Sequence, residues 1–332
     1  MNVRRQTAKG WLCAIGMSTL AIAHAASATA DEFPDKPVEM TVPFPAGSSA
    51  DVVARVLADG MSRQLGQPVT VMNRPGAGSA IGYKYVQARK PDGYSIVFNS
   101  NSISTAYYQG LVPFDYKAFD PVARVSVELP VVAVKADAPW NSLRDLVADA
   151  KKRPGEIRLG NSGFGSHTHT SAVAFFHETR AEVTHVAFGA SQVVTSLIGG
   201  HIDALVQLPG ALTAHVKAGT LKVLGVMGSN REPAFPHVPT AREQGFDFQA
   251  DMWRGIAVPK GTPAPVVARL EAAVRKAVES AEFKTQGEKL GFVPAFQSAP
   301  DFGHTIATED VLLAKLMTDV GLRKTPEPQA KF

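Results

Sequence analysis

The chain of 332 residues carries 34 basic and 30 acidic residues and a single cysteine. One cysteine excludes a disulfide framework, and the near balance of charge gives no reason to expect nucleic acid or an anionic membrane as a partner. A chain of this length is predicted to form two domains, each able to bury its own core.

The first thirty residues have the layout of a secretory signal peptide. Three positive charges and no negative one precede an uncharged, largely apolar stretch at 11–26, and small residues recur at Ala26, Ala28 and Ala30 as at a cleavage site. The apolar stretch is short and rich in Ala, Ser and Thr, which disfavours a membrane anchor. Cys13 follows two large residues, so lipidation is not expected. We expect residues 1–30 to be removed on export.

Strand-like and helix-like runs then alternate along the chain. Helices are predicted at 51–65, where apolar residues recur every fourth position, and at 265–278, where a proline lies in the first turn. Predicted strands are residues 38–42, 69–72, 94–98, 131–134, 158–160, 183–186, 204–206 and 223–227. The alternation predicts α/β domains with largely parallel sheets.

Two short apolar runs, at 130–134 and 253–258, are candidate crossover strands between domains. Residues 31–134 and 253–323 are then expected to form a discontinuous first domain, and residues 135–252 an inserted second domain. Two crossing strands form a hinge that permits closure around a ligand. Residues 324–332 contain two prolines and are expected to be a flexible tail.

The loop at residues 43–51 (PFPAGSSAD) joins the first predicted strand to the first predicted helix. In an open α/β sheet, ligands bind beyond the carboxyl ends of the strands, and a helix start offers unpaired N–H groups with a partial positive charge. Gly47 permits a close approach, and Ser48 and Ser49 add hydroxyl donors, which together suit an anion. A simple helix cap, with Ser49 or Asp51 accepting from the first N–H groups, explains the pattern equally well.

A second loop of this type lies at residues 160–167 (GNSGFGSH), before another expected helix. In the hinge interpretation this loop belongs to the other domain. Two helix starts are then expected to face each other across a cleft, so that a carboxylate at one and a polar group at the other would close the cleft.

A third glycine-rich loop, residues 73–82 (NRPGAGSAIG), resembles a dinucleotide-binding fingerprint. Its spacing is G-x-G-x-x-x-G, one residue too long, and no Walker motif is present. We therefore expect no cofactor.

Catalysis and metal binding are alternatives to ligand capture. Ser166 and His167 are adjacent in sequence, which rarely gives a nucleophile–base pair, and no G-x-S-x-G elbow occurs. His167, His169 and His177 suggest a metal, but residues two apart on a helix do not share a face, and no H-E-x-x-H occurs. An exported hydrolase with a Ser/His site and a metal-binding receptor remain alternatives; we predict no catalytic residue and no metal ligand.

Short motifs recur in a fixed order over nearly the whole chain. They are residues 33–38 (FPDKPV), 42–55 (VPFPAGSSADVVAR), 65–69 (LGQPV), 73–78 (NRPGAG), 91–94 (PDGY), 199–203 (GGHID), 236–240 (PHVPT) and 259–263 (PKGTP). In this order and at these separations they resemble the Bug family, the receptors of tripartite tricarboxylate transporters. Ligands of similar proteins include di- and tricarboxylates, acidic amino acids, nicotinate and aromatic acids.

The resemblance implies an α/β, two-domain periplasmic-binding-protein fold (type II-like) with mixed or parallel sheets, a ligand cleft between the domains and a two-strand hinge. It implies a periplasmic, monomeric solute-binding protein that is not an enzyme and that delivers a small organic carboxylate to the membrane components of a transporter. The implied ligand-binding residues are Phe44, Ala46, Gly47, Ser48, Ser49, Ala50, Asp51, Ala77, Gly78, Asn99, Ser162, Gly163, Phe164, Gly165, Ser166, His167, Phe188 and Asp203.

The chain departs from the family pattern at several of these positions. Ala46 and Ser48 replace the more usual Pro and Gly, Phe164 stands where a small residue or Thr is common, and Leu208 follows Gln207 where a Phe-Asp pair is frequent. Residues 187–191 (AFGAS) replace a more typical Pro-Tyr-Lys-Gly, so the usual lysine is absent. Fewer charges and two phenylalanines predict a distal pocket for an apolar or aromatic tail, in place of a second carboxylate.

Overall fold

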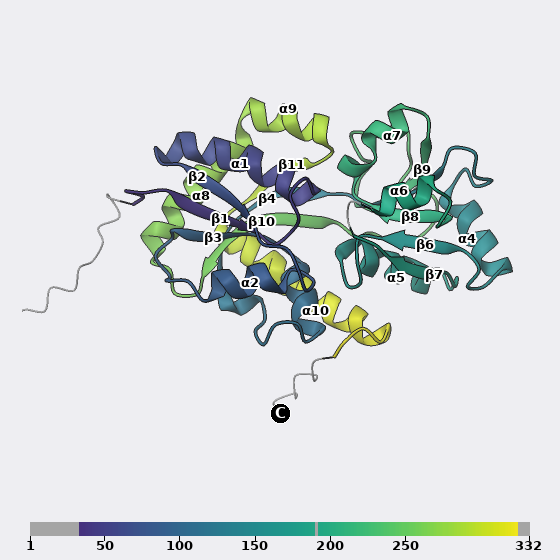
Figure 1. Ribbon diagram of the computed structural model, residues 1–332, viewed down its shortest axis with the longest axis horizontal. Helices are drawn as coiled ribbons and strands as arrows, with labels where there is room; N and C mark the ends of the chain where they lie inside the picture. The colour runs from purple at the N-terminus through teal and green to yellow at the C-terminus, as the bar shows by residue number, and fades with distance from the viewer. Residues whose placement is uncertain (1–32, 190–191, 325–332) are drawn as a thin grey trace, which may run out of the picture.

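The computed structural model describes residues 33–189 and 192–324. The predicted signal peptide and all of the predicted tail except Lys324 lie outside these residues. Two sheets lie side by side, each with helices on both faces, and β10, an inner strand of one sheet, extends toward the other (Figure 1). We call them the six-stranded part and the five-stranded part.

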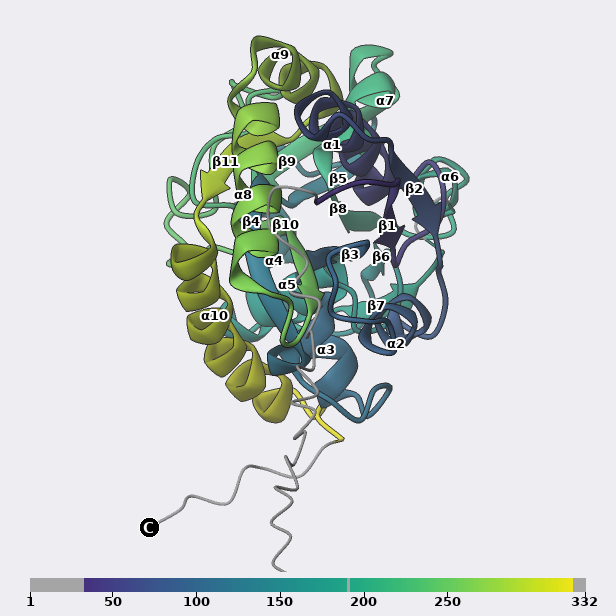
Figure 2. The ribbon, with the colours of Figure 1, turned by 90° about the vertical axis from the view of Figure 1, so that its left-hand side faces the viewer.

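The six-stranded part is built from both ends of the described chain. Its elements are β1 (Val38–Val42), α1 (Ser49–Leu65), β2 (Val69–Asn73), α2 (Ala80–Gln87), β3 (Ser95–Ser100), α3 (Ser102–Tyr108), η1 (Tyr116–Ala118), β4 (Phe119–Glu128), β10 (Met252–Pro259), α8 (Ala264–Glu279), α9 (Ala281–Leu290), β11 (Val293–Gln297) and α10 (Ala299–Asp319). Figure 2 looks at this part from its outer end, with α8 and α10 at the front.

The five-stranded part comes from the middle of the chain. Its elements are β5 (Val131–Lys135), α4 (Leu143–Lys152), β6 (Arg158–Asn161), α5 (His167–Glu178), β7 (Thr184–Ala187), α6 (Val193–Ile198), β8 (Ala204–Gln207), η2 (Pro209–Ala211), α7 (Thr213–Lys217) and β9 (Leu221–Val226). The strands and helices predicted from the sequence are confirmed, with ends that differ by a residue or two. The prediction omitted the strands β4 and β11 and the helices α2, α3, α4, α6, α7, α9 and α10.

The two sheets are mixed, although the alternation of elements predicted largely parallel ones. The strand orders are β11-β4-β10-β3-β1-β2 and β7-β6-β8-β5-β9. The pairs β1–β2, β1–β3, β6–β7 and β6–β8 are parallel, whereas β10 runs antiparallel to β3 and β4, and β5 runs antiparallel to β8 and β9. The antiparallel strands β4, β5, β9 and β10 are those at which the chain passes between the parts.

Alternating residues of the central strands bury side chains on both faces of each sheet. In β3, Ile96 and Phe98 pack with α1 and α8, whereas Val97 packs with α2 and α3. In β5, Val132 contributes to the core with α4 and α5, whereas Ala133 contributes to the core with α6. Because successive strand side chains point to opposite faces, such runs are apolar throughout when both faces are covered. The resulting core holds rigid strands whose ends carry the loops described below.

The chain crosses between the two parts twice. It passes from β4 to β5 through Leu129 and Pro130 alone, and it returns from β9 to β10 through residues 227–251. The boundary that we placed at residue 134 lies within β5, whose residues pair with β8 and β9 of the five-stranded part. In our two-domain proposal the first crossing therefore moves to residues 129–130. Among the described helices, none combines the length and apolar character needed to cross a membrane.

Candidate ligand-binding site

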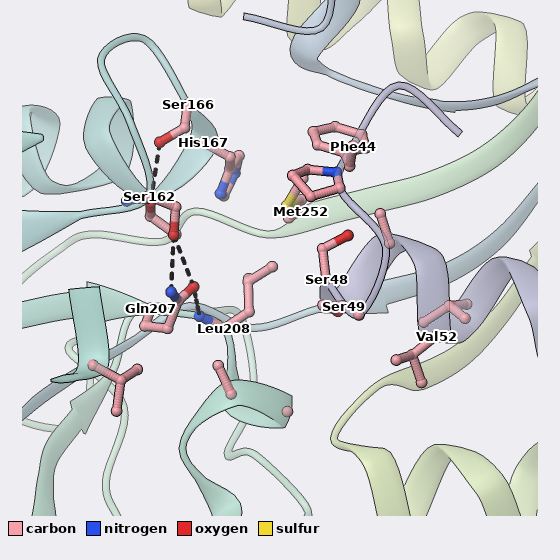
Figure 3. A pocket seen from close by; sticks show the side chains of 18 of the residues that line it. Phe44, Ser48, Ser49, Val52, Ser162, Ser166, His167, Gln207, Leu208 and Met252 are labelled. Carbon is pink, nitrogen blue, oxygen red and sulfur yellow. Dashed lines mark hydrogen bonds between the residues drawn. The ribbon is translucent and has the colours of Figure 1, made fainter. Parts of the chain in front are cut away.

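A cavity of about 410 Å³ lies between the two parts (Figure 3). The six-stranded part contributes the loop after β1, the start of α1, and the first residues of β10. The five-stranded part contributes the loop after β6, the start of α5, and the residues after β8. The volume suits a small molecule, since ligand pockets typically measure about 300–1,000 Å³. The predicted residues that line it are Phe44, Ala46, Gly47, Ser48, Ser49, Ala50, Ser162, Ser166 and His167.

The start of α1 is capped and still offers unpaired donors. Ser48, rather than Ser49 or Asp51, is the N-cap residue, and its hydroxyl accepts from the N–H of Asp51 at 3.3 Å. Gly47 adopts a φ of 76°, which favours glycine, and its N–H donates to the Asp51 carboxylate at 2.9 Å. Among the described residues, the N–H groups of Ser49 and Ala50 have no hydrogen-bond acceptor. The loop therefore caps the helix and also leaves two N–H donors, an arrangement that suits an anion.

The start of α5 repeats this arrangement on the opposite wall. Ser166 caps the helix and accepts from the N–H of His169 at 3.2 Å. The N–H of Gly165 donates to Nδ1 of His169 at 3.0 Å, which fixes the turn before the helix. Figure 3 shows Ser162, Ser166 and His167 across the cavity from Phe44, Ser48 and Ser49. Two helix starts thus face one cavity, as the two loops predicted.

Gln207 and Leu208 form a third wall that the sequence did not single out as ligand-binding. Nε2 of Gln207 donates to the Ser162 hydroxyl at 2.8 Å, and its Oε1 accepts from the N–H of Leu208 at 2.8 Å. Gln207 is the last residue of β8, and its position at the carboxyl end of a strand was the available signal. These bonds hold the Ser162 hydroxyl in place at the cavity.

The sequence also missed an ion pair behind the first loop. Nε of Arg254 in β10 donates to Oε2 of Glu128 in β4 at 2.7 Å, and the two side chains are 3% and 0% exposed. The hydroxyl of Ser49 donates to the other carboxylate oxygen, Oε1. The available signal was an arginine within the otherwise apolar run 252–258, because a buried charge needs a partner.

His167 is held by groups other than its neighbour Ser166. Its Nε2 lies 3.1 Å from the carbonyl oxygen of Asp251, and its Nδ1 lies 3.3 Å from the hydroxyl of Ser171. Burial, together with the positive charge of Arg254, lowers the pKa of His167 to about 4, so the ring is neutral at pH 7. Ser166 instead contacts Thr168 at 3.1 Å. This arrangement favours a structural role for His167.

No group of three or more His, Cys, Asp or Glu side chains within residues 33–189 and 192–324 is placed to hold a metal ion. The ring of His169 packs against Phe164 and His185.

Two predicted residues lie behind the cavity wall. Asp51 is buried, and its carboxylate accepts from the Gly47 N–H, the Asn73 amide and Arg55. Asn99 is buried in β3, where its Oδ1 accepts from the Tyr83 hydroxyl at 3.0 Å. Both hold neighbouring backbone and side chains in place without lining the cavity.

Ala77, Gly78, Gly163, Phe164 and Gly165 also lie outside the cavity lining. Ala77 and Gly78 are exposed, and Phe164 is 57% exposed with its ring on His169. A Cβ atom on Gly165 would overlap the side chain of Gln109 at the end of α3, so this glycine allows the two parts to touch.

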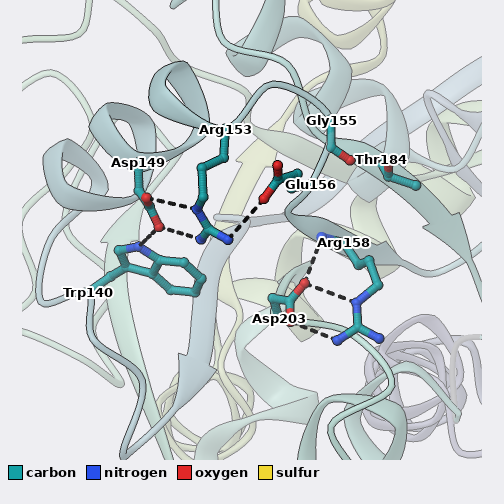
Figure 4. Close-up of polar contacts among 8 residues, drawn as sticks. All are labelled: Trp140, Asp149, Arg153, Gly155, Glu156, Arg158, Thr184 and Asp203. Atoms are coloured by element: carbon teal, nitrogen blue, oxygen red, sulfur yellow. Dashed lines mark hydrogen bonds and ion pairs between the residues drawn. The ribbon is translucent and has the colours of Figure 1, made fainter.

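Phe188 and Asp203 are directed to other contacts. Phe188 packs against the core around α6. Asp203 forms an ion pair with Arg158 at 2.8 Å and accepts from the Arg158 N–H (Figure 4). The apolar character of the cavity therefore comes from residues such as Phe44, Leu208 and Met252, and not from the two phenylalanines on which we based that hypothesis.

A second cavity, of about 430 Å³, lies against α10 and shares His167 with the first. Its wall contains Glu309, whose Oε2 accepts from Nε1 of Trp253 at 2.5 Å. Burial raises the pKa of Glu309 to about 7; nearby Asp251 raises it further, whereas the Trp253 hydrogen bond and Arg124 oppose the rise. In the folded protein this carboxyl therefore binds a proton more tightly than in the unfolded chain.

The raised pKa of Glu309 predicts that stability falls as the pH rises from about 4.5 to about 7. The folded state holds more protons in this range, so the free energy of unfolding decreases by up to about 1.4 kcal/mol per pH unit for one such group. Denaturant unfolding of the wild type and Glu309→Gln between pH 5 and 8 measures the effect. Because burial also raises the pKa of Glu232, the difference between the two proteins is the relevant quantity. Identical pH dependence in both would contradict the assignment.

The chain is similar to a family of transport receptors and to several solved structures. The family described as tripartite tricarboxylate transporter family receptor matches residues 53–322. Protein BugT of Bordetella pertussis is 32% identical over 318 residues, which cover 94% of this chain and 98% of that protein. An R. palustris protein solved with adipate has a TM-score of 0.81 at 26% identity, over 87% of this chain and 99% of that one. MatC from Rhodopseudomonas palustris, solved with bound malate, has a TM-score of 0.77 at 26% identity, over 86% and 99%.

Proposed function

The chain belongs to the tripartite tricarboxylate transporter family of receptors and is a solute-binding receptor, and from this premise we propose that its cavity captures one small organic carboxylate. The observation that carries the proposal is the pair of helix starts, α1 and α5, that face one cavity from the two parts of the fold. Helix N-termini favour anions, because their first N–H groups are unpaired and the helix dipole is positive there. The unpaired N–H groups of Ser49 and Ala50 would bind the carboxylate.

Reversible capture of a carboxylate requires no covalent reaction. A ligand that contacts both walls favours the closed arrangement by its differential affinity for it. The closed form is then the species that the membrane components of the transporter receive. The protein acts as a monomer, without catalysis, cofactor or nucleic acid, in this proposal. The two relatives solved with malate and adipate support the class of ligand.

Residues 1–30 export the chain to the periplasm in this proposal. The order of positive charges, apolar stretch and small residues supports it. The family consists of periplasmic binding proteins, and the periplasm is the compartment where such a receptor meets its solute.

Thermal unfolding against a panel of carboxylic acids tests the proposed function. A ligand at a thousand times its Kd adds about 4 kcal/mol to the free energy of unfolding. For a chain of this size that raises the unfolding midpoint by roughly several degrees. At least one acid among C4 dicarboxylates, citrate, acidic amino acids, nicotinate, hexanoate, adipate and benzoates is expected to do so, with or without a metal chelator.

Ala211→Trp provides the matched control, because Ala211 lines the cavity and is exposed, so that a large side chain there fills the cavity without disturbing the core. The shift should disappear in this variant. A flat response to every acid, combined with a shift on adding zinc or with turnover of a test ester, would reject the receptor function in favour of a metal receptor or a hydrolase.

A further inference from the structure

Arg254 supplies the only guanidinium or ammonium group among the described residues that line the cavity. It is 2% exposed, and its position in β10 places it on the face of the sheet that carries α1. A buried arginine at a cavity wall is costly unless its charge and its donors are satisfied. The hydrogen-bond partners and the counter-charge of Arg254 therefore determine which ligands the cavity can bind.

Not every hydrogen-bond donor of Arg254 has an acceptor. Its Nε donates to Glu128, but Nη1 is buried and lacks a hydrogen-bond partner within the part of the chain that the structure describes. Its guanidinium carbon lies 5.0 Å from the ring centroid of Phe44, in the loop after β1. Because Glu128 also accepts from Ser49, the arginine, the glutamate and the loop form one connected unit beside the start of α1.

The remaining cavity wall carries no fixed charge to balance a second anion. No aspartate, glutamate, lysine or further arginine lines it among the described residues. Two of the described histidines line it: His167, which is neutral at pH 7, and His215 of α7. The residues farther from α1 that belong to the five-stranded part include Val194, Leu208 and Ala211, which offer apolar surface.

Taking the proposed function as its basis, we propose that Arg254 is the charged anchor for a single ligand carboxylate, and that its pairing with Glu128 makes the receptor selective for monocarboxylates with an apolar body. One carboxylate gains a charge-assisted hydrogen bond from the unpaired donor of Arg254 in addition to the N–H groups of the α1 start. A second carboxylate at the other end of the same ligand loses its hydration without meeting a cation, because no further lysine or arginine lines the described cavity wall.

A comparison of hexanoate with adipate tests the selectivity directly, because the two acids share a six-carbon chain and differ by one terminal carboxylate. Isothermal titration calorimetry at pH 8 keeps histidine cations out of the comparison. The wild type is expected to bind hexanoate at least tenfold more tightly than adipate. Benzoate and terephthalate give the same comparison on an aromatic body. Tighter binding of the dicarboxylate in both pairs would overturn the inference while leaving the receptor function intact.

Variants of the ion pair assign the selectivity to Arg254. Glu128→Gln keeps hydrogen-bonding groups toward Arg254 and Ser49 but leaves the arginine unbalanced, so adipate should gain at least tenfold in affinity relative to hexanoate. The double variant Glu128→Gln/Arg254→Met removes both charges together, which avoids an unpaired buried charge, and should weaken monocarboxylate binding tenfold or more. Arg158→Met, which breaks an ion pair outside the cavity lining, is the control and should leave both affinities unchanged.

These experiments distinguish failure of the role assigned to Arg254 from failure of the receptor function. Unchanged affinities in the double variant and an unchanged ratio in Glu128→Gln would show that Arg254 is not the anchor, whichever acid binds. Absence of binding by all four acids, together with no stabilisation by any other acid of the panel, would reject the receptor function itself.

Discussion

Replacing Gly210 by alanine is expected to weaken ligand binding about tenfold or more, because overpacking a tight contact costs about 1–3 kcal/mol and each 1.4 kcal/mol is a factor of ten. Gly210 follows β8 in the five-stranded part, and a Cβ atom there would lie 2.5 Å from the carbonyl oxygen of Leu290 at the end of α9. The φ of Gly210 is not positive, so alanine causes no backbone strain of its own. The added methyl group acts on the distance between the two parts.

Small-angle scattering and calorimetry together measure this effect. Gly210→Ala should show a larger radius of gyration than the wild type and a weaker affinity for whichever acid stabilises the wild type, with little change in the unfolding midpoint of the unliganded protein. Gly303→Ala is the matched control, because its Cβ would lie 3.3 Å from Pro121 within the six-stranded part alone. Wild-type affinity in Gly210→Ala would mean that this close approach is not needed for binding.

Replacing Asp51 by alanine is expected to lower the free energy of unfolding by about 1–3 kcal/mol, because three partly buried hydrogen bonds to its carboxylate are lost together. The carboxylate accepts from the Gly47 N–H at 2.9 Å, from the Asn73 amide at 2.9 Å and from Arg55 at 3.0 Å. Without it the turn that presents the α1 start is no longer fixed. Ligand affinity should fall with stability, although Asp51 does not line the cavity.

The pH dependence of Asp51 has a definite sign. Burial alone would raise the pKa of this carboxyl, but Arg55, the Gly47 N–H and Asn73 together hold it below its ordinary value. Its contribution to stability is therefore present above an unfolded pKa of about 3.9 and is lost as the pH falls through the lower folded value. The difference in stability between the wild type and Asp51→Ala should shrink below pH 4.

Denaturant unfolding at pH 7 and pH 3 measures both effects. Asp59→Ala on the same helix is the control, because its pair with Arg63 at 3.5 Å is exposed and should contribute little. If Asp51→Ala is no less stable than Asp59→Ala at pH 7, then the turn at Gly47 does not depend on the Asp51 carboxylate.

The ion pair between Glu128 and Arg254 lies next to the connection about which the two parts would rotate. Glu128 is the last residue of β4, and Arg254 lies near the start of β10, so the ion pair sits beside the crossing at residues 129–130. Rotation of one part against the other about such crossings is a hinge motion. A ligand carboxylate held by Arg254 and by the α1 start is therefore held by the six-stranded part, while the start of α5 and Gln207 meet the rest of the ligand on closure.

Local features of the sequence were sufficient to identify the two helix starts. The turn at Gly47 and an N-cap hydroxyl depend on residues within a single turn, although the cap is Ser48 and not Ser49 or Asp51 as predicted. The apolar spacing of α1 likewise determined its buried face, since Val53, Leu57, Met61 and Leu65 are all buried. The ordered motifs identified the family for a different reason: their order and their separations are specific, and both can be found in the sequence directly.

Only the tertiary structure decided which side chains meet at the cavity. Phe164, Phe188 and Asp203 follow or precede the right strands, but the first is exposed, the second packs on another core and the third pairs with Arg158. Glu128 and Arg254 lie 126 residues apart and meet because β4 and β10 are antiparallel neighbours. Strand order and register are set by packing over the whole sheet, and no local pattern encodes them.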